Sequence, residues 1–541
     1  MDVLHQESGP AITWSRVNMA ESVVGVQTPL SWSFWDAGGE MGFRIGYHQL
    51  GLLPRAALTI PGSIDEQFTA IFYGHGACNI NTFVTALAAM PGAAAAEEGF
   101  FARRSGGGGG RRLLSARARR WLVRAWMPVV AAALPWRLRK LSAESKAFWR
   151  ATTAPGALTG QGATAGALAE SLHRFGPAVG MQIVASTFAG TFYGRVQQLL
   201  ARVERPDLEL KLIGGYGSMQ EIQLTQDLWR AAHAARGSGD FAEFLVDHGF
   251  HGPAEGELSS HSWREDPAPI EAMMAKFAEM APGDAPEDAE RRAARERKAA
   301  ERIVLEHSHG FDRLRTRVVL ALSRRYIPLR VEAKTAFMQV FDAARAAARA
   351  TGEQLAAEGT LDAADDVFSL TLDELQGRRP VDVKATVRER RALRARYAAM
   401  DLPLEWVGMP EVTAHRDDIS DEVAATRHIE ALGVSGGKAE GIARVLVDPN
   451  DPDALEPGDV LVCHTTDPSW SSHFFVASAV VIDIGGMLSH GAIVARELGI
   501  PCVISTGNGT TSIRSGDRVL VDGDAGTVEI LERPATGTLA S

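Results

Sequence analysis

The residues best suited to chemistry surround His490, in a segment that reads IGGMLSHGAIVARELGIP from residue 484 to residue 501. A β-branched run ends in two glycines, and apolar residues then recur at helical spacing until Gly499 and Pro501. This pattern predicts a buried strand, a tight turn and an amphipathic helix over residues 489–498. His490 would then lie where the helix begins.

The start of a helix is a place where a histidine side chain can act as a nucleophile. Unpaired backbone N–H groups and the positive end of the helix dipole disfavour an imidazolium there and favour an anion. A neutral imidazole has a lone pair that can attack phosphorus, and the same helix end would then stabilise the bound phosphoryl group. The alternative is that His490 is a helix cap or an ordinary surface histidine.

Four neighbours of His490 complete a predicted phosphate-binding site. Ser489 can cap the helix and donate its hydroxyl to a phosphate oxygen. Gly485 and Gly486 allow the backbone to approach a phosphate closely because no Cβ intervenes. Gly491 keeps the first helical turn uncrowded. The site would thus combine a nucleophile, an anion-binding backbone and room for a bulky donor.

Four further residues have supporting roles that the pattern leaves open. Thr466, Asp467 and Trp470 either border the phosphorylated site or form a turn whose tryptophan fills the core. Arg496 either reaches a phosphate on a partner domain or lies on the solvated face of the helix.

The pattern of residue types along the chain predicts the helices and strands that position these residues. Residues 433–535 alternate short β-branched runs with turn signals, which is typical of a compact α/β domain. Residues 1–410 are expected to form a large, mainly α-helical region, and residues 411–432 a linker. The expected strands of the α/β domain are 443–447, 460–463, 479–484, 502–505, 518–521 and 527–531, with a hairpin loop at 522–526.

The segment GGMLSHGAIVARELGIPCV resembles the signature of the swivelling phosphohistidine domain in the phosphoenolpyruvate-utilising enzymes. These enzymes include phosphoenolpyruvate synthase, pyruvate, phosphate dikinase and the rifampicin phosphotransferases. Residues 436–441, 458–462 and 466–470 are similar to further elements of the same domain. The motif's histidine is phosphorylated in that family, so the resemblance implies that His490 carries a phosphoryl group.

Short segments of the helical region resemble the rifampicin-phosphotransferase branch of this family. They are residues 28–33 (TPLSWS), 248–258 (HGFHGPAEGEL), 263–267 (WREDP), 365–371 (DDVFSLT) and 374–375 (EL). The chain departs from the family at residues 329–334, which read LRVEAK where the family tends to have R-E-x-P-K. The resemblance implies that the helical region binds a substrate that accepts the phosphoryl group.

A polar cluster in the second of these segments supplies candidates for handling the acceptor. His248, His251, Glu255 and Glu257 are expected to act as a general base or to orient the acceptor. A helical region rich in phenylalanine and tryptophan can enclose a small molecule in an apolar pocket around such groups. The alternative is a turn that only joins helices.

Composition excludes several classes of function. The chain has 541 residues and a formal net charge of −10, which disfavours a nucleic-acid binder that works by neutralising phosphates. Its three cysteines form no C-x-x-C pair, so we expect neither a disulfide scaffold nor a metal site, and Cys463 and Cys502 are expected in the core. The first residues lack an apolar secretory stretch, which favours a cytoplasmic protein.

A basic, glycine-rich insertion near residues 92–141 has no counterpart that we recognise in the family. Five glycines at 106–110 predict a flexible linker, and an arginine-rich stretch follows that predicts an amphipathic helix broken at Pro128. One interpretation is weak contact of residues 101–141 with an anionic membrane surface or an acidic partner. The other is a surface helix that packs its apolar side on its own domain.

Taken together, these features predict a phosphotransferase component. Nothing before residue 430 resembles an ATP-grasp domain, so ATP and Mg²⁺ are expected on a separate ATP-grasp partner, and no cofactor is expected on this chain. His490 would carry the phosphoryl group from that partner to a small-molecule acceptor in the helical region. The alternative is a catalytically inactive binding or regulatory protein that retains the fold.

Overall fold

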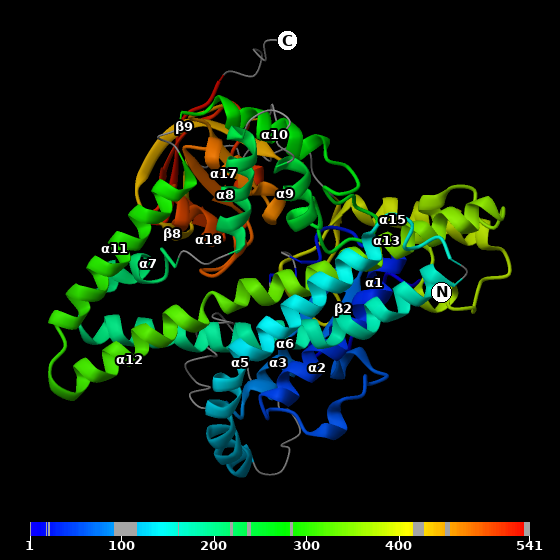
Figure 1. The fold of residues 1–541 in the computed structure, drawn as a ribbon, viewed down its shortest axis with the longest axis horizontal. Helices are drawn as coiled ribbons and strands as arrows, with labels where there is room; N and C mark the ends of the chain where they lie inside the picture. Colours follow the sequence, from blue (N-terminus) through cyan, green and yellow to red (C-terminus); the bar gives the residue numbers. More distant parts are fainter. Residues whose placement is uncertain are drawn as a thin grey trace. The chain divides into compact units, whose positions relative to one another are not determined.

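The computed structural model describes residues 2–17, 19, 22–90, 116–160, 162–216, 220–234, 240–281, 285–414, 427–449 and 455–534 (Figure 1). The glycine run at 106–110 and most of the expected linker at 411–432 lie outside these residues. The chain folds as two compact units, each built from separate stretches of sequence. The boundaries expected at residues 410 and 433 stay predictions.

The first unit comprises Met1–Arg195, Ala254–Ser260 and Leu322–His415 and is mainly helical. Its α-helices are α1 (Pro29–Phe34), α2 (Glu40–Gln49), α3 (Ile80–Leu87), α5 (Ala116–Thr153), most of α6 (Ala163–Arg202), α13 (Leu329–Ala357), α14 (Leu372–Leu375) and α15 (Val383–Ala398). Its strands are β1 (Thr13–Ser15), β2 (Thr69–Phe72), β3 (His75–Asn79) and β5 (Glu405–Val407), in the order β2-β3-β1-β5, and the pair β4 (Met400–Asp401) and β6 (Thr413–Ala414).

Helix α5 is continuous, so the break expected at Pro128 is wrong. Pro128 and Pro135 both lie inside the helix. A proline removes one backbone hydrogen bond, but buried side chains on either side of it hold the helix in place. Val123 and Leu138 are among these buried residues, and α5 packs against α13.

The second unit comprises Val196–Pro253, His261–Ala321 and Arg416–Ser541. Its α-helices are the end of α6, α7 (Glu209–Leu212), α8 (Gln220–His233), α9 (Asp240–His248), α10 (Ala268–Glu279), α11 (Pro286–Glu306), most of α12 (Gly310–Tyr326), α17 (Ser471–Val476), α18 (His490–Leu498) and α19 (Gly509–Ser512). Its strands are β7 (His428–Glu430), β8 (Leu432–Ser435), β9 (Lys438–Leu446), β10 (Val460–Cys463), β11 (Ala479–Ile482), β12 (Cys502–Ile504), β13 (Arg518–Asp522) and β14 (Thr527–Glu532).

These strands form one sheet in the order β7-β14-β13-β9-β10-β11-β12-β8, shown in orange and red beside α17 and α18 in Figure 1. Strands β9 to β12 are parallel, and β13 and β14 form the hairpin expected around residues 522–526. In β10, Val460 and Val462 enter one core cluster while Leu461 and Cys463 enter the other. Both faces are therefore covered, which is why the strand has no polar side.

The fold class expected from the sequence is confirmed: a large helical region is joined to a C-terminal α/β sheet domain. Cys463 and Cys502 are buried in its core, and burial raises the pKa of both thiols. Within the described ranges, no helix is both long enough and apolar enough to span a bilayer.

Candidate functional site

His490 is the first residue of α18, as the sequence predicts. Ser489 caps the helix in an extended conformation, and its hydroxyl accepts a hydrogen bond from the backbone N–H of Ala492 at 3.4 Å. Gly499 ends the helix with a left-handed backbone, φ 71°. Capping at one end and a glycine at the other fix where the helix begins, and this fixes the position of His490.

The imidazole of His490 lies between two hydroxyl groups. Its Nε2 is 3.2 Å from Ser471 Oγ and its Nδ1 is 3.3 Å from Thr466 Oγ1. A hydroxyl can donate to one ring nitrogen and accept from the other, so this environment suits a neutral imidazole in either tautomer.

The ring is also more deeply buried than that of a histidine at the start of a surface helix would be. His490 is only 2% exposed, and the edge of the Phe474 ring faces it at a centroid distance of 6.2 Å. The alternative interpretation as a surface histidine is therefore wrong. A molecule from solution can reach this nitrogen only after the surrounding side chains move apart.

Ser471 is a site residue that the sequence reasoning missed. It is the first residue of α17, directly after the turn of residues 466–470, and it is buried. The one feature of the sequence that points to Ser471 is that a small polar residue directly follows the turn. Its contact with a residue in another helix depends on tertiary packing, which local spacing does not specify.

The turn at residues 466–470 contacts both His490 and the core of the sheet. Thr466 borders His490. Asp467 accepts a hydrogen bond from the Ser469 backbone N–H at 2.9 Å and begins a 3₁₀ turn. Trp470 is buried in the core cluster of the sheet. The turn therefore fixes the position of Thr466 while its tryptophan anchors it to the core.

Among the predicted phosphate-binding glycines, Gly491 has the tightest surroundings. A Cβ at this position would lie 2.4 Å from Ile482 Cδ1 and 2.8 Å from Thr466 Oγ1. A Cβ at Gly485 would lie 3.1 Å from Ser489 Oγ, whereas one at Gly486 would have no atom within 4 Å. Gly491 is thus required by packing, whereas Gly486 borders open space.

Arg496 has neither of the two roles considered for it. Its side chain is buried and points inward, where Nε donates to the Val434 carbonyl at 3.1 Å and Nη2 donates to the Met487 carbonyl at 2.8 Å. The guanidinium thus ties the loop before His490 to strand β8. A guanidinium is planar and has several N–H donors, so it can donate to two buried carbonyls at once. The spacing of residues along one helix does not reveal that such carbonyls lie nearby.

The next residue of α18 binds the turn that follows α7. The Glu497 carboxylate accepts a hydrogen bond from the Gly215 backbone N–H at 2.7 Å. Burial raises the pKa of this carboxyl, while Arg496 opposes that rise. Helix α18 also packs against α8 and α11, so the helix that begins at His490 is held by both the sheet and these helices.

Asp483 supports the same edge of the sheet from the end of β11. Its carboxylate accepts hydrogen bonds from the Thr506 hydroxyl at 2.6 Å and from the backbone N–H and hydroxyl of Thr510, and it lies 3.3 Å from His464 Nδ1. Burial acts to raise the pKa of Asp483, but these hydrogen bonds outweigh burial and lower it.

Replacement of Asp483 by asparagine is expected to lower the free energy of unfolding by about 1–3 kcal/mol, because buried hydroxyl and N–H donors lose a charged acceptor. Its folded-state pKa is depressed, so its stabilisation is present above the unfolded pKa of 3.8 and is lost as the pH falls through the folded value. Urea unfolding over a pH series measures both effects. The exposed Glu529→Gln is the matched control, and an equal loss in both variants contradicts the prediction.

Two of the acceptor-site candidates, His248 and His251, lie in the second unit. His248 Nε2 is 2.7 Å from Asp227 Oδ2, and both side chains are partly exposed. His251 is buried, with its ring 4.0 Å from that of Phe250 and 5.7 Å from that of Trp263. His248 thus has the carboxylate partner that orients an imidazole, whereas His251 is packed among aromatic rings.

The other two candidates, Glu255 and Glu257, are buried in the first unit. The Glu257 carboxylate accepts hydrogen bonds from Thr28 N at 2.9 Å, Thr28 Oγ1 at 2.8 Å and Ser31 Oγ at 2.6 Å. Glu257 therefore joins two of the sequence segments that resemble the rifampicin-phosphotransferase branch. This contact supports the interpretation of Glu257 as a residue that joins helices.

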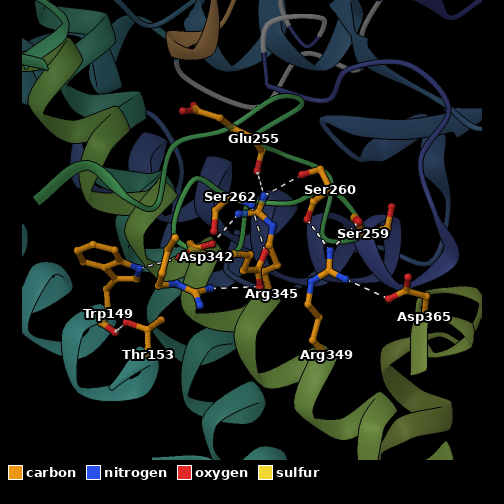
Figure 2. A network of polar contacts seen from close by, with 12 residues as sticks. Trp149, Thr153, Glu255, Ser259, Ser260, Ser262, Asp342, Arg345, Arg349 and Asp365 are labelled. Carbon is orange, nitrogen blue, oxygen red and sulfur yellow. Dashed lines mark hydrogen bonds and ion pairs between the residues drawn. The ribbon is translucent and has the colours of Figure 1, made fainter. Parts of the chain in front are cut away.

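Figure 2 shows the polar network that continues from this contact on α13. Arg345 bonds to Asp342 at 2.6 Å and donates to the Glu255 carbonyl at 2.9 Å. Arg349 donates to the Ser259 carbonyl at 2.8 Å and pairs with Asp365 at 3.0 Å. Segments that are far apart in the sequence thus meet around two arginines of one helix.

No cluster of three or more histidine, cysteine, aspartate or glutamate side chains placed to hold a metal ion occurs in the part of the chain that the structure describes.

Comparison with known proteins gives two matches to described families. Residues 455–526 match the mobile domain of the PEP-utilising enzymes, and residues 237–330 match the fourth domain of rifampicin phosphotransferase. The first match contains His490 and the turn at 466–470, and the second contains His248 and His251.

Curated relatives agree with these matches. An uncharacterized protein of Mycobacterium tuberculosis is 29% identical over 66% of this chain and 37% of its own length. A rifampicin phosphotransferase of Streptomyces sviceus is 38% identical over 34% of this chain and 21% of its own length. An uncharacterized phosphotransferase of Bacillus subtilis is 36% identical over 34% of this chain and 23% of its own length. The chain thus covers well under half the length of each of these relatives.

Proposed function

We propose that this chain, whose residues 455–526 match the mobile domain of the PEP-utilising enzymes, is the phosphoryl-carrying part of a phosphotransferase, with His490 as the residue that becomes phosphorylated. One observation carries the proposal: in the matched domain, a histidine at the first position of a helix has hydroxyl partners at both ring nitrogens. Hydroxyl partners at both nitrogens suit a neutral imidazole, whose lone pair can attack phosphorus.

The proposed reaction has two balanced steps. A ring nitrogen of His490 forms a bond to phosphorus with its lone pair, and the P–O bond to the leaving group of the donor breaks. An acceptor hydroxyl then attacks the same phosphorus, the N–P bond breaks, and the electron pair returns to the imidazole. The hydroxyl proton passes to a base. Catalysis of such transfers is mostly positioning and charge stabilisation, which the N-terminus of α18 would supply.

Movement of the α/β domain is part of this proposal, since the ring of His490 is enclosed. Helix α18 packs on α8 and α11 within the same unit, while Thr466, Ser471 and Phe474 lie against its imidazole. Uncovering the ring would therefore need a shift of these three side chains as well as any movement of the helix. We propose that the domain alternates between this enclosed arrangement and one in which a donor reaches His490. We propose that the donor is an ATP-grasp partner that holds ATP and Mg²⁺ and that the reaction takes place in the cytoplasm.

His248 is the proposed base for the acceptor hydroxyl. The Asp227 carboxylate beside Nε2 favours the tautomer with its proton on Nε2, so that Nδ1 carries the lone pair. We expect His248→Gln to lower acceptor phosphorylation roughly 10²-fold while the phosphorylation of His490 itself stays unchanged. Separate assays of the two half-reactions measure this, and an equal loss in both would exclude the assignment.

The hydroxyl partners of His490 are expected to matter for the first half-reaction. Thr466→Val together with Ser471→Ala should slow phosphorylation of His490 roughly 10- to 100-fold, since the ring loses the two groups that orient it. Single-turnover phosphorylation at saturating donor measures the rate. Thr511→Val, at an exposed threonine of α19, is the control, and a wild-type rate in the double variant would contradict the role.

The experiment that tests the proposed function is a labelling reaction. The chain is incubated with an ATP-grasp protein encoded beside it and with ATP labelled separately at the β and γ phosphates. A label that is lost in acid and kept in base is expected, since phosphohistidine has that stability. Persistent absence of label would favour the alternative, a binding or regulatory protein that retains the fold without turnover.

A further inference from the structure

Helix α5 has an exposed apolar stripe that its own unit leaves uncovered. Trp121 is 72% exposed, Leu122 71% and Trp136 64%, and Val129 and Trp126 are about half exposed. Large apolar side chains scattered singly on a surface are ordinary, but a continuous row of them is not. This row therefore needs an explanation.

The spacing of these residues places them on one side of the helix. Leu122, Trp126, Val129 and Trp136 follow one another at intervals of four, three and seven residues, which is the helical repeat. The opposite side is covered, because Val123, Val130, Leu134 and Leu138 are buried. The helix thus has two apolar sides, and from Trp121 to Trp136 the uncovered one extends roughly 22 Å.

The charge around this stripe is mostly positive, and Glu144, 3.8 Å from Lys140, is the first acidic residue of α5. Arg124, Arg139 and Lys140 are exposed on α5, and the Arg124 guanidinium lies over the Trp121 ring at 5.7 Å. The sequence has no aspartate or glutamate from residue 99 to residue 143, although the whole chain has a net charge of −10. A locally basic surface on an acidic protein points to an anionic binding surface.

We propose that this face of α5 binds an anionic membrane surface, with the indole rings of Trp121 and Trp136 in the headgroup region and the arginines against lipid phosphates. Tryptophan favours that region because one edge of its ring is apolar while its N–H can be hydrogen-bonded. A helix with this composition lies in the plane of the interface. The cytoplasmic leaflet, rich in anionic lipids, supplies the complementary charge.

A second copy of the chain fits this face less well. An isologous contact through α5 would place Arg124, Arg139 and Lys140 near the same residues of the other copy, and like charges at such a contact are repulsive. This surface lies in the first unit, whereas His490 lies in the second. The proposed membrane contact therefore does not depend on the proposed phosphoryl transfer, and each can be tested without the other.

Vesicle co-sedimentation of the full chain tests the proposal. The wild type should bind phosphatidylcholine vesicles that contain phosphatidylserine and should release them at high salt. The bound fraction should fall at least roughly tenfold in the variant Trp121→Ser/Leu122→Ser/Trp136→Ser and in the variant Arg124→Glu/Arg139→Glu. Trp126 is kept because its Nε1 donates to the Gln49 carbonyl at 2.8 Å. Circular dichroism confirms that the variants are folded.

The matched control is Arg378→Glu/Arg379→Glu, which makes the same change of charge on the first unit away from α5 and should bind like the wild type. Two results overturn the proposal: no wild-type binding to phosphatidylserine vesicles, or equal binding of the triple serine variant. Retention of the wild type on immobilised polyglutamate without vesicle binding would assign the face to an acidic protein instead and would also overturn it.

Discussion

Replacement of His490 by alanine is expected to lower phosphoryl transfer to the acceptor by at least ~10³-fold, since removal of a covalent nucleophile leaves only the contribution of binding. The imidazole lies between the hydroxyls of Thr466 and Ser471, and neither hydroxyl can replace it because an alcohol is a weak nucleophile at neutral pH. Initial rates of acceptor phosphorylation with excess donor measure the loss.

The control for this variant is His428→Gln, which changes an exposed histidine of β7 in the same unit. It should transfer phosphate at the wild-type rate. Both variants should unfold cooperatively, so that a loss of activity in His490→Ala is not a loss of fold. Transfer at more than a few per cent of the wild-type rate in folded His490→Ala would mean that another residue carries the phosphate.

Replacement of Gly491 by alanine is expected to destabilise the second unit by about 1–3 kcal/mol, which is typical of an extra methyl group in a filled space. The new Cβ would overlap Ile482 Cδ1 at 2.4 Å and Thr466 Oγ1 at 2.8 Å. The Ile482 side chain can relieve the first overlap by moving, whereas relief of the second moves α18 or Thr466, and both of these position His490. Phosphorylation of His490 should therefore slow along with the fall in stability.

Gly486→Ala is the matched control for packing, because a Cβ there meets no atom within 4 Å. Thermal unfolding of both variants distinguishes a filled space from an open one. Gly491→Ala should unfold several degrees below the wild type, and Gly486→Ala within a degree or so of it. If the two variants unfold at the same temperature, the packing described around Gly491 is wrong.

Much of the α/β domain follows from local sequence pattern. Strands β10 to β14 lie within or close to the β-branched runs that predict them, and α18 begins beside the serine that caps it. These features depend on residues next to one another in the chain, such as the cap at Ser489 and the glycine at 499. The position of His490 at a helix start was therefore predictable.

Contacts between distant segments were not predictable in this way. Ser471 approaches His490 only because α17 packs beside α18. Arg496 points inward because two carbonyls in different elements face it, whereas spacing along one helix cannot distinguish a buried guanidinium from a solvated one. The meeting of residues 28–31 with Glu257 likewise depends on the tertiary fold.

Helix α5 has one side that packs on its own unit and another that is exposed. The basic insertion was considered either as a helix packed on its own domain or as a surface for anions. Helix α5 buries Val130 and Leu134 and leaves Trp121 and Trp136 exposed. The pattern alone could not separate these two sides, because both are apolar.

Direct identification of the phosphorylated atom tests the central claim. The labelling reaction is quenched in base, the chain is digested, and the phosphopeptide is sequenced by mass spectrometry under neutral conditions. Nuclear magnetic resonance spectra of ³¹P in the intact labelled protein distinguish a phosphorus–nitrogen bond from a phosphate ester. We expect one phosphate, on a ring nitrogen of His490. Phosphate on a serine, threonine, aspartate or any other histidine would contradict this prediction.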